Sequence, residues 1–359
     1  MIFTFIALGV ALFFAMNIGA SGTAASMGAA YGSGVIKRRP AMILVALCAF
    51  AGAVLGGDEV VKTIGNGIIP KEILSVSIVI IILGSATLTL FISNLMGIPL
   101  STSEVTVGAI VGVGVAYESV YIHSLIFIVA FWIAIPIISF LIAYVVGKGI
   151  LVCQKKWPEL EGRGKWAKGL GKILILCGCI EAFSAGMNNV ANAVGPLVGA
   201  NMITTGQGIW VGSFFLALGA IFLGGKVLET NGKKITRLSL LQGSTVSATG
   251  GSLVIIASIF GVPVPLTQVT TAAILGVGTA ENGLRLWQKE VIRKIMKVWI
   301  VSPISSLVVS YTLVNLVLTP NLYVVFMILS VFISTVGLIS LSQTMRREKS
   351  TINDQGGGI

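Results

Sequence analysis

Long stretches without any charged residue constrain the fold of this chain more than any other feature. Lysine, arginine, aspartate and glutamate are absent from residues 1–36, 73–103, 182–225, 238–280 and 298–345. A helix that crosses a bilayer needs about 20 mostly apolar residues. The longer stretches must therefore each hold two crossings, or one crossing and a re-entrant hairpin. Only 10% of the residues are charged, against about 25% in soluble domains, so we predict an all-α integral membrane protein.

Charge and composition exclude several functional classes. A net charge of +11 would suit a nucleic-acid-binding protein, but basic cytoplasmic loops explain it in a membrane protein, and no nucleic acid is expected as a partner. The four cysteines form no disulfide framework, and His123 is the single histidine, so no metal site is expected. The N-terminus lacks the basic start of a signal peptide, and we expect the first helix to be retained.

Two copies of one pattern follow each other in the chain. An offset of 167 positions aligns the small residues of 19–32 with those of 186–199. An offset of 164 then aligns Gly97-Ile98-Pro99 with Gly261-Val262-Pro263, together with the Val-Thr pairs that follow. Matches that include Pro, Val and Thr in one order indicate an internal duplication.

Charges in the loops predict that the two copies have opposite orientations. The loop 37–40 is basic, whereas the equivalent loop 201–207 is uncharged; the next two pairs of loops reverse this pattern. The positive-inside rule then places matching loops on opposite sides of the membrane. The predicted cytoplasmic loops are 37–40, 148–172, 225–237 and 281–297, and the predicted outer loops are 57–72, 117–123, 201–207 and 319–322.

The predicted architecture has about 11 transmembrane or re-entrant segments in two inverted-topology repeats, with the N-terminus outside and the C-terminus inside. The repeats span 1–147 and 172–310, and a basic cytoplasmic linker, 148–171, joins them. A C-terminal transmembrane helix region, 311–345, and a cytoplasmic tail, 346–359, follow. Inverted repeats with Gly- or Pro-interrupted segments are typical of secondary transporters, whose substrate site lies near the midplane between the copies.

The first candidate site motif is rich in small, hydroxyl and amide residues within an apolar segment. It runs from Asn17 to Ser26 in the first copy and from Gly186 to Ala193 in the second. Because Gly and Asn favour helix breaks and caps, we expect a broken helix in each copy, with free backbone N–H groups that bind an anion. The expected anion ligands are Ser21, Gly22, Thr23, Asn188, Asn189 and Asn192. The alternative for nearby glycines, such as Gly195-xxx-Gly199, is close helix packing.

The second candidate motif is Pro99-Leu100-Ser101-Thr102-Ser103-Glu104, matched by Pro263-Val264-Pro265-Leu266-Thr267-Gln268. Proline followed by Ser or Thr at a helix start is ordinary capping chemistry. At the tip of a re-entrant hairpin the same hydroxyl groups would surround an anion. The expected ligands from this motif are Ser101, Thr102, Ser103 and Thr267, and the first copy offers more hydroxyl groups than the second.

Two acidic residues lie at predicted membrane depth, Glu104 and Glu181. An intramembrane carboxyl group marks a functional site by default. Together with Gln268 and Asn17, these residues are the candidates for binding a coupling ion, and Glu181 is a candidate proton carrier. The alternative for Glu181 is a protonated, hydrogen-bonded structural group.

These motifs resemble the inorganic phosphate transporter family, whose hallmark is a twice-repeated Gly-Ala-Asn-Asp-Val-Ala-Asn-Ala followed by a twice-repeated Pro-x-Ser-Thr-Thr-His. The second copy, from Gly186 to Ala193, matches six of the eight positions of the first hallmark. The resemblance covers both copies and implies a dimeric, cation-coupled anion importer.

The departures from the family pattern point to its sulfate permease branch, which the first motif, Asn-Ile-Gly-Ala-Ser-Gly, resembles. Gly22 and Asn189 replace the two family aspartates, and Glu104 and Gln268 replace the two histidines. Phosphate at neutral pH usually keeps a proton that a carboxylate can accept, whereas sulfate has none. Beside sulfate, a carboxylate would be an unpaired like charge in a low-dielectric site.

The sequence therefore predicts a secondary active transporter in the inner (cytoplasmic) membrane that imports sulfate by cation symport and alternating access. A proton is favoured over sodium as the coupling ion, and the family resemblance implies a homodimer. The open alternatives are an inorganic phosphate symporter of the same family and an anion channel, which also uses hydroxyl groups and broken helices. No catalytic residues or cofactor are expected, so an enzyme is not predicted.

Overall fold

The computed structural model describes residues 1–95, 100–161, 165–232, 238–283, 290–324, 326–327 and 330. The chain forms two compact units, residues 1–310 and 311–359. In the second unit the described part is the end of the last helix, to Val317, and a few residues beyond it. The rest of the predicted membrane region 311–345, and the whole predicted tail 346–359, lie outside the described residues.

Every regular element in the described part of the chain is a helix, as the sequence predicted. The helices of the first half are α1 (Ile2–Gly32), α2 (Arg38–Gly56), α3 (Asp58–Asn66), α4 (Val76–Leu95), α5 (Thr102–Ala116) and α6 (Ile122–Lys156). Those of the second half are α7 (Lys165–Gly199), α8 (Thr205–Phe222), α9 (Gly224–Gly232), α10 (Leu240–Ile259), α11 (Leu266–Asn282) and α12 (Glu290–Val317). Two 3₁₀ turns, η1 (Lys71–Ile73) and η2 (Pro158–Glu161), lie in connections.

Eight of the described helices are long and apolar enough to cross a membrane, and α5 is a shorter apolar helix. The eight are α1, α2, α4, α6, α7, α8, α10 and α12. Length and composition therefore agree with a multi-pass membrane protein. The total of about 11 segments and the outside position of the N-terminus remain predictions.

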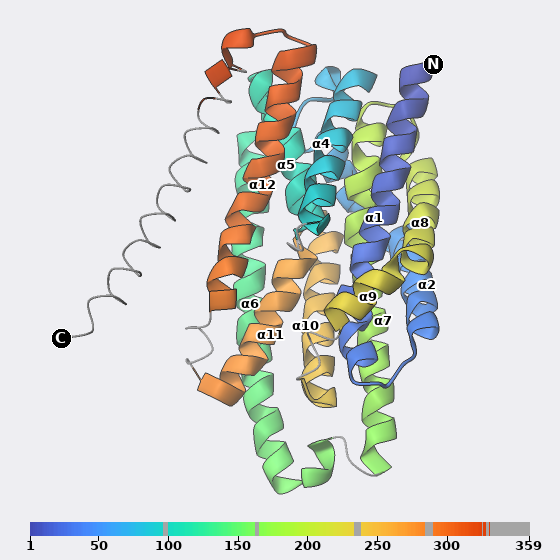
Figure 1. The fold of residues 1–359 in the computed structure, drawn as a ribbon, viewed down its shortest axis with the longest axis vertical. Helices are drawn as coiled ribbons and strands as arrows, with labels where there is room; N and C mark the ends of the chain where they lie inside the picture. Colours follow the sequence, from blue (N-terminus) through green and yellow to red (C-terminus); the bar gives the residue numbers. More distant parts are fainter. Residues whose placement is uncertain are drawn as a thin grey trace, which may run out of the picture. The chain divides into compact units, whose positions relative to one another are not determined.

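The helices of the two halves recur at the offsets found in the sequence. Helices α1 and α7 end at Gly32 and Gly199, 167 positions apart, and α2 and α8 begin at the same offset. Helices α4 and α10 are both 20 residues long and lie 164 positions apart at both ends. Figure 1 shows α4 and α5 in the upper part of the first unit and α10 and α11 in its lower part.

The expectation that the first motif breaks its helix in each copy is wrong. Helix α1 runs without interruption through Asn17–Ser26, and α7 runs through Gly186–Ala193. In α1 the hydroxyl groups of Ser21 and Thr23 donate to carbonyls of their own helix, at Ile18 and Gly19. Such bonds satisfy the side chains without any break in the helix.

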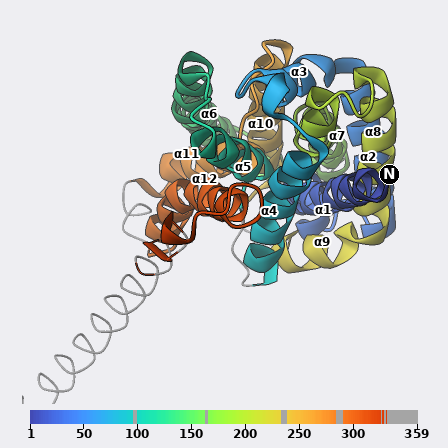
Figure 2. The same ribbon diagram turned by 90° about the horizontal axis from the view of Figure 1, so that it is seen from above.

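Close packing explains the glycines around the second copy. Helix α7 packs against α1, α2, α3 and α10, and Figure 2 shows it among these helices in the view from above. A Cβ atom on Gly186 would collide with the carbonyl oxygen of Ala49, and one on Gly199 would collide with that of Gly65. Only glycine allows these backbones to approach so closely, as the packing alternative predicted for Gly195-xxx-Gly199.

Candidate functional site

The second motif forms helix starts deep in the protein. Helix α5 begins directly after Ser101, whose Oγ accepts a hydrogen bond from the backbone N–H of Glu104 at 3.5 Å. The capping interpretation of this serine is therefore confirmed. Helix α11 begins after Pro265, which provides no side-chain cap. Pro99, the first residue of the first copy, lies outside the described residues.

The two helix starts meet at equivalent positions. The amide of Gln268 donates a hydrogen bond to Oε1 of Glu104, and these residues are separated by 164 positions, the offset between the two copies. Both side chains are buried. Glu104 and Gln268 lie in the first turns of their helices, so this contact brings the start of α5 next to the start of α11.

The amides of α7 reach the hydroxyl groups of α5. Asn192 donates from Nδ2 to Oγ1 of Thr102 at 3.3 Å and to Oγ of Ser103 at 3.1 Å. Thr102 in turn donates to Oδ1 of Asn189 at 3.3 Å. All four side chains are buried. We call this set (Thr102, Ser103, Asn189 and Asn192) the amide–hydroxyl network.

The third amide of α7, Asn188, joins the network to the turn between α10 and α11. Its Oδ1 accepts from the Ser103 hydroxyl at 3.3 Å and from the backbone N–H of Val264 at 3.2 Å. Its Nδ2 donates to Oγ of Ser258 at 2.9 Å and to the carbonyl of Val262 at 3.0 Å. Sequence reasoning predicted the asparagines and hydroxyl groups of this cluster and their proximity.

Other predicted ligands lie apart from the network. The side chain of Asn17 donates to the carbonyl of Phe13 in its own helix. Ser21 and Thr23 are satisfied within α1 by the bonds to Ile18 and Gly19. For Thr267, the described residues contain no hydrogen bond from its hydroxyl group to the network, although its carbonyl accepts from Thr271.

Gly22 is the exception in the first copy, because it faces the network across a small void. The void has a volume of about 10 Å³, and Gly22 of α1 and Asn189 of α7 both line it. A single water molecule needs at least about that volume, so the void is too small for an anion. These are the two positions at which the family pattern has aspartate, and the structure brings them to one place.

Glu181 lies in α7, about two helical turns before Asn188, and is fully buried. Its Oε1 accepts a hydrogen bond from the hydroxyl of Thr270 at 2.7 Å, and the hydroxyl of Ser247 also lies beside the carboxyl group. Its Oε2 has no hydrogen-bond partner in the described part of the chain. Gly250 of α10 leaves room next to this carboxyl group, since a Cβ there would lie 3.6 Å from Oε1.

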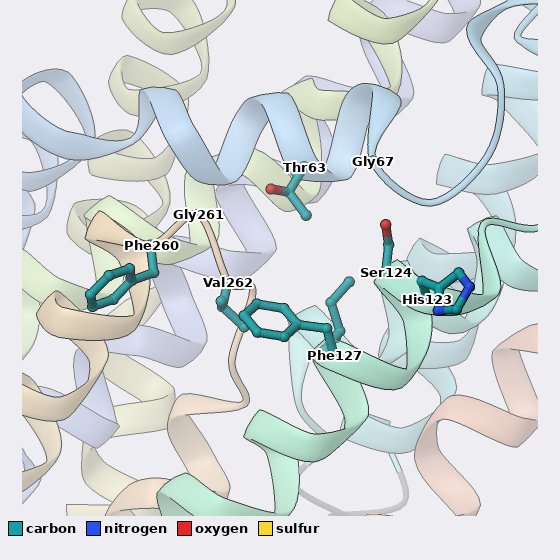
Figure 3. A pocket seen from close by; sticks show the side chains of 9 residues that line it. Thr63, Gly67, His123, Ser124, Phe127, Phe260, Gly261 and Val262 are labelled. Atoms are coloured by element: carbon teal, nitrogen blue, oxygen red, sulfur yellow. The ribbon is translucent and has the colours of Figure 1, made fainter.

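A pocket of about 360 Å³, which we call the vestibule, opens next to the turn between α10 and α11. Figure 3 shows that α3 provides Thr63, α6 provides His123 and Ser124, and the turn provides Gly261 and Val262. Phe127, Ile128, Phe260 and Gly67 complete the lining. The turn links the vestibule lining to the network through Asn188, which bonds to the Val262 carbonyl and accepts from Ser103.

Sequence reasoning missed Ser258, Thr270 and the backbone groups of Val262 and Val264. Thr270 had a signal, because it belongs to the Val-Thr pair that repeats at Thr106. The two threonines nevertheless differ, since Thr106 donates to the carbonyl of Thr102 in its own helix and Thr270 donates to Glu181. The backbone groups carry no residue-specific signal at all.

Comparisons with known proteins agree with this geometry. The sequence model of the phosphate transporter family matches residues 18–160 and 151–310. The chain is 54% identical to the sulfate permease CysP of Bacillus subtilis (strain 168) over 97% of this chain and 98% of that protein. A solved structure, "The sodium-dependent phosphate transporter", superposes with a TM-score of 0.77 at 25% identity, covering 89% of this chain and 100% of the other.

The relatives and the fold are those of transporters and not of enzymes. The family match covers most of the chain, and the helices are those of a multi-pass membrane protein. The chain therefore belongs to the phosphate transporter family, on its sulfate permease branch.

Proposed function

We propose that this protein is a secondary active transporter that imports sulfate across the cytoplasmic (inner) membrane by cation symport. The main observation in favour of sulfate is that Gly22 and Asn189 replace both family aspartates and lie next to the same small void. The 54% identity to a protein named as a sulfate permease supports the same choice.

Selectivity follows from the charge of the bound anion. The amide–hydroxyl network offers neutral N–H and O–H groups, which can donate to any tetrahedral oxyanion. Sulfate is a dianion without a proton, so a carboxylate beside it in a site of low dielectric constant would only repel it. Phosphate at neutral pH keeps a proton that an aspartate can accept. Neutral residues at 22 and 189 therefore favour sulfate.

Two inverted repeats would allow alternating access around this site. The recurrence of helix bounds at two offsets, the two successive family matches and the Glu104–Gln268 contact support the repeats at 1–147 and 172–310. The opposite loop charges support the inversion and the N-out orientation. Rocking of one repeat-derived bundle against the other is the usual transport motion of such architectures.

A proton is the proposed coupling ion, with Glu181 as its carrier. The carboxyl group is buried, one of its oxygens lacks a partner among the described residues, and its neighbours are the hydroxyl groups of Thr270 and Ser247. Charge at such depth is costly, so a carboxyl group that gains and loses a proton during the cycle fits this place. Glu104, bonded to Gln268, is the second candidate.

Uptake into proteoliposomes tests the proposal. Radiolabelled sulfate should accumulate above its electrochemical gradient when an inward proton gradient is imposed, and excess phosphate should compete weakly. Accumulation driven only by sodium would overturn proton coupling. Strong competition by phosphate would favour a phosphate symporter, as the likeness to a sodium-dependent phosphate transporter allows. A channel would equilibrate sulfate without accumulating it.

The variant Glu181→Gln tests whether Glu181 carries the coupling proton without being needed for sulfate binding. Glutamine keeps an oxygen that can accept from Thr270 but cannot carry a proton. We expect proton-driven accumulation to fall about tenfold or more, while sulfate–sulfate exchange continues. Proton-driven accumulation at the normal level would assign the coupling to another group.

A further inference from the structure

The four hydrogen bonds of Asn188 give it a role different from that of the other two asparagines. A side-chain amide has two N–H donors and an oxygen with two lone pairs. In Asn188 all four are occupied, by Ser258, Val262, Val264 and Ser103. By contrast, in the described part of the chain Asn189 donates no hydrogen bond from its Nδ2 and faces the void beside Gly22. Asn189 therefore has donors to offer an anion, and Asn188 has none.

The turn that Asn188 contacts is only partly bonded by its own backbone: the N–H groups of Gly261 and Val262 donate to carbonyls in the last turn of α10. Residues 260–265 between α10 and α11 form no regular secondary structure, and Gly261 adopts a positive φ of 69°. Irregular backbone at membrane depth is tolerated only where other groups satisfy it. Asn188 binds the turn from the side of the network, at Val262 and Val264. Trp132 of α6 binds it from the other side, donating from Nε1 to the carbonyl of Pro263 at 2.8 Å.

We propose that the turn 260–265 is a gate between the vestibule and the amide–hydroxyl network, and that Asn188 is a positioning residue that keeps this gate closed. The vestibule is the space from which sulfate reaches the gate. This inference rests on the proposed transport function, but the gate itself is defined by contacts and not by the identity of the anion.

The vestibule is large enough to hold the anion next to the turn. Its volume of about 360 Å³ exceeds that of a small tetrahedral anion with part of its hydration shell. Val262 contributes to its wall with a buried side chain, while its carbonyl is bonded to Asn188 on the far side. One residue thus lines the vestibule and bonds to Asn188, which is joined to the network through Ser103. Displacing this turn would break its contact with Asn188 and move the Val262 side of the vestibule wall.

Cysteine labelling measures the opening of the gate directly. The reporter is Val262→Cys, and the matched control is Ser124→Cys, which lines the same vestibule from α6 and has no bond to Asn188. Both are placed in protein whose four native cysteines are replaced by alanine. A membrane-impermeant methanethiosulfonate is added on the side bearing α3 and the start of α6, which is the outside in the proposed topology.

Two changes weaken the gate in graded steps: Asn188→Asp removes the bond to the Val262 carbonyl, and Asn188→Ala removes the bonds to both Val262 and Val264. Ser258→Ala is the matched control, because it removes a bond from Asn188 to α10 that does not reach the turn. Each lost bond to the turn should raise the labelling rate of Val262→Cys about fivefold, because one hydrogen bond is worth about that factor in an opening equilibrium. The rate at Ser124→Cys should stay constant. If Asn188→Ala fails to fold, Asn188→Asp still tests the gate, because it removes the bond to the Val262 carbonyl.

Transport kinetics give the second measurement. A gate residue should change the maximal rate of sulfate uptake and leave the KM within about threefold, whereas an anion ligand should raise the KM about tenfold or more. An unchanged labelling rate at Val262→Cys in both Asn188 variants would overturn the gate, as would a control cysteine that never reacts. If the wild-type protein transports no sulfate but labelling follows the gradient, the proposed substrate fails and the gate stands.

Discussion

The two copies of the first motif occupy equivalent helices but use their polar side chains in opposite ways. In α1, Ser21 and Thr23 bond to carbonyls one turn back in the same helix. In α7, Asn189 and Asn192 bond to residues of α5 that are more than 80 positions away in the chain. The polar side chains of the first copy therefore bond within their own helix, and those of the second copy bond to another helix, α5. The helix bounds recur in the two halves, but the contacts of the polar side chains do not.

The largest difference between the copies should appear when each loses one polar side chain. Asn192→Ala removes the donors to Thr102 and Ser103, and we expect sulfate uptake to fall about 100-fold. Ser21→Ala, the control in the first copy, removes only a bond within α1 and should change uptake less than about threefold. Initial rates in proteoliposomes check both. Equal losses would mean that the site is symmetric after all.

Restoring an aspartate tests whether selectivity depends on the pair of positions at the void. Asn189→Asp places a carboxylate beside the network, so sulfate uptake should fall about tenfold and phosphate uptake should become measurable. Gly22→Asp should act in the same direction from α1. Gly22→Ala is the control for volume, because a Cβ at Gly22 meets nothing within 4 Å. Sulfate uptake at the normal level in Asn189→Asp, with no phosphate uptake, would contradict the selectivity argument.

The smallest expected difference concerns the repeated threonines Thr106 and Thr270. Thr270→Val removes the hydroxyl bonded to Glu181 and should reduce proton-driven uptake about threefold to tenfold. Thr106→Val removes a bond within α5 and should leave transport within about twofold. The measurement is sulfate accumulation at a fixed proton gradient. A larger effect in Thr106→Val would place the coupling group on α5, at Glu104.

Much of this arrangement could be predicted from the sequence, because apolar length and duplicated motifs leave strong patterns. The membrane class, the family, the cap at Ser101 and the asparagines of α7 all followed from residue types and spacing. The predicted helix breaks are not present in α1 and α7, because glycine and asparagine allow a break but do not require one. Ser21 and Thr23 could bond to their own helix, and this removed the need for it.

What the sequence could not predict was the partner of each polar group. Asn188 was expected to bind the anion, yet two of its four partners are backbone groups of Val262 and Val264, whose side chains are apolar. Backbone donors and acceptors are present at nearly every residue, so their use depends on tertiary structure alone. The same limit applies to Ser258, which became relevant only through its position next to Asn188.

One short segment, residues 262–270, touches three separate groups of the protein. Val262 and Val264 bond to Asn188, Gln268 bonds to Glu104, and Thr270 bonds to Glu181. Any displacement of this segment therefore changes the surroundings of both acidic side chains at the same moment. Coupling free energies are reciprocal. If displacement of the segment changes the free energy of protonation of Glu104 or Glu181, protonation of that residue must change the free energy of the displacement by the same amount. In the proposed symport, sulfate and the proton would thus affect each other's binding through one short segment of chain, without being in contact.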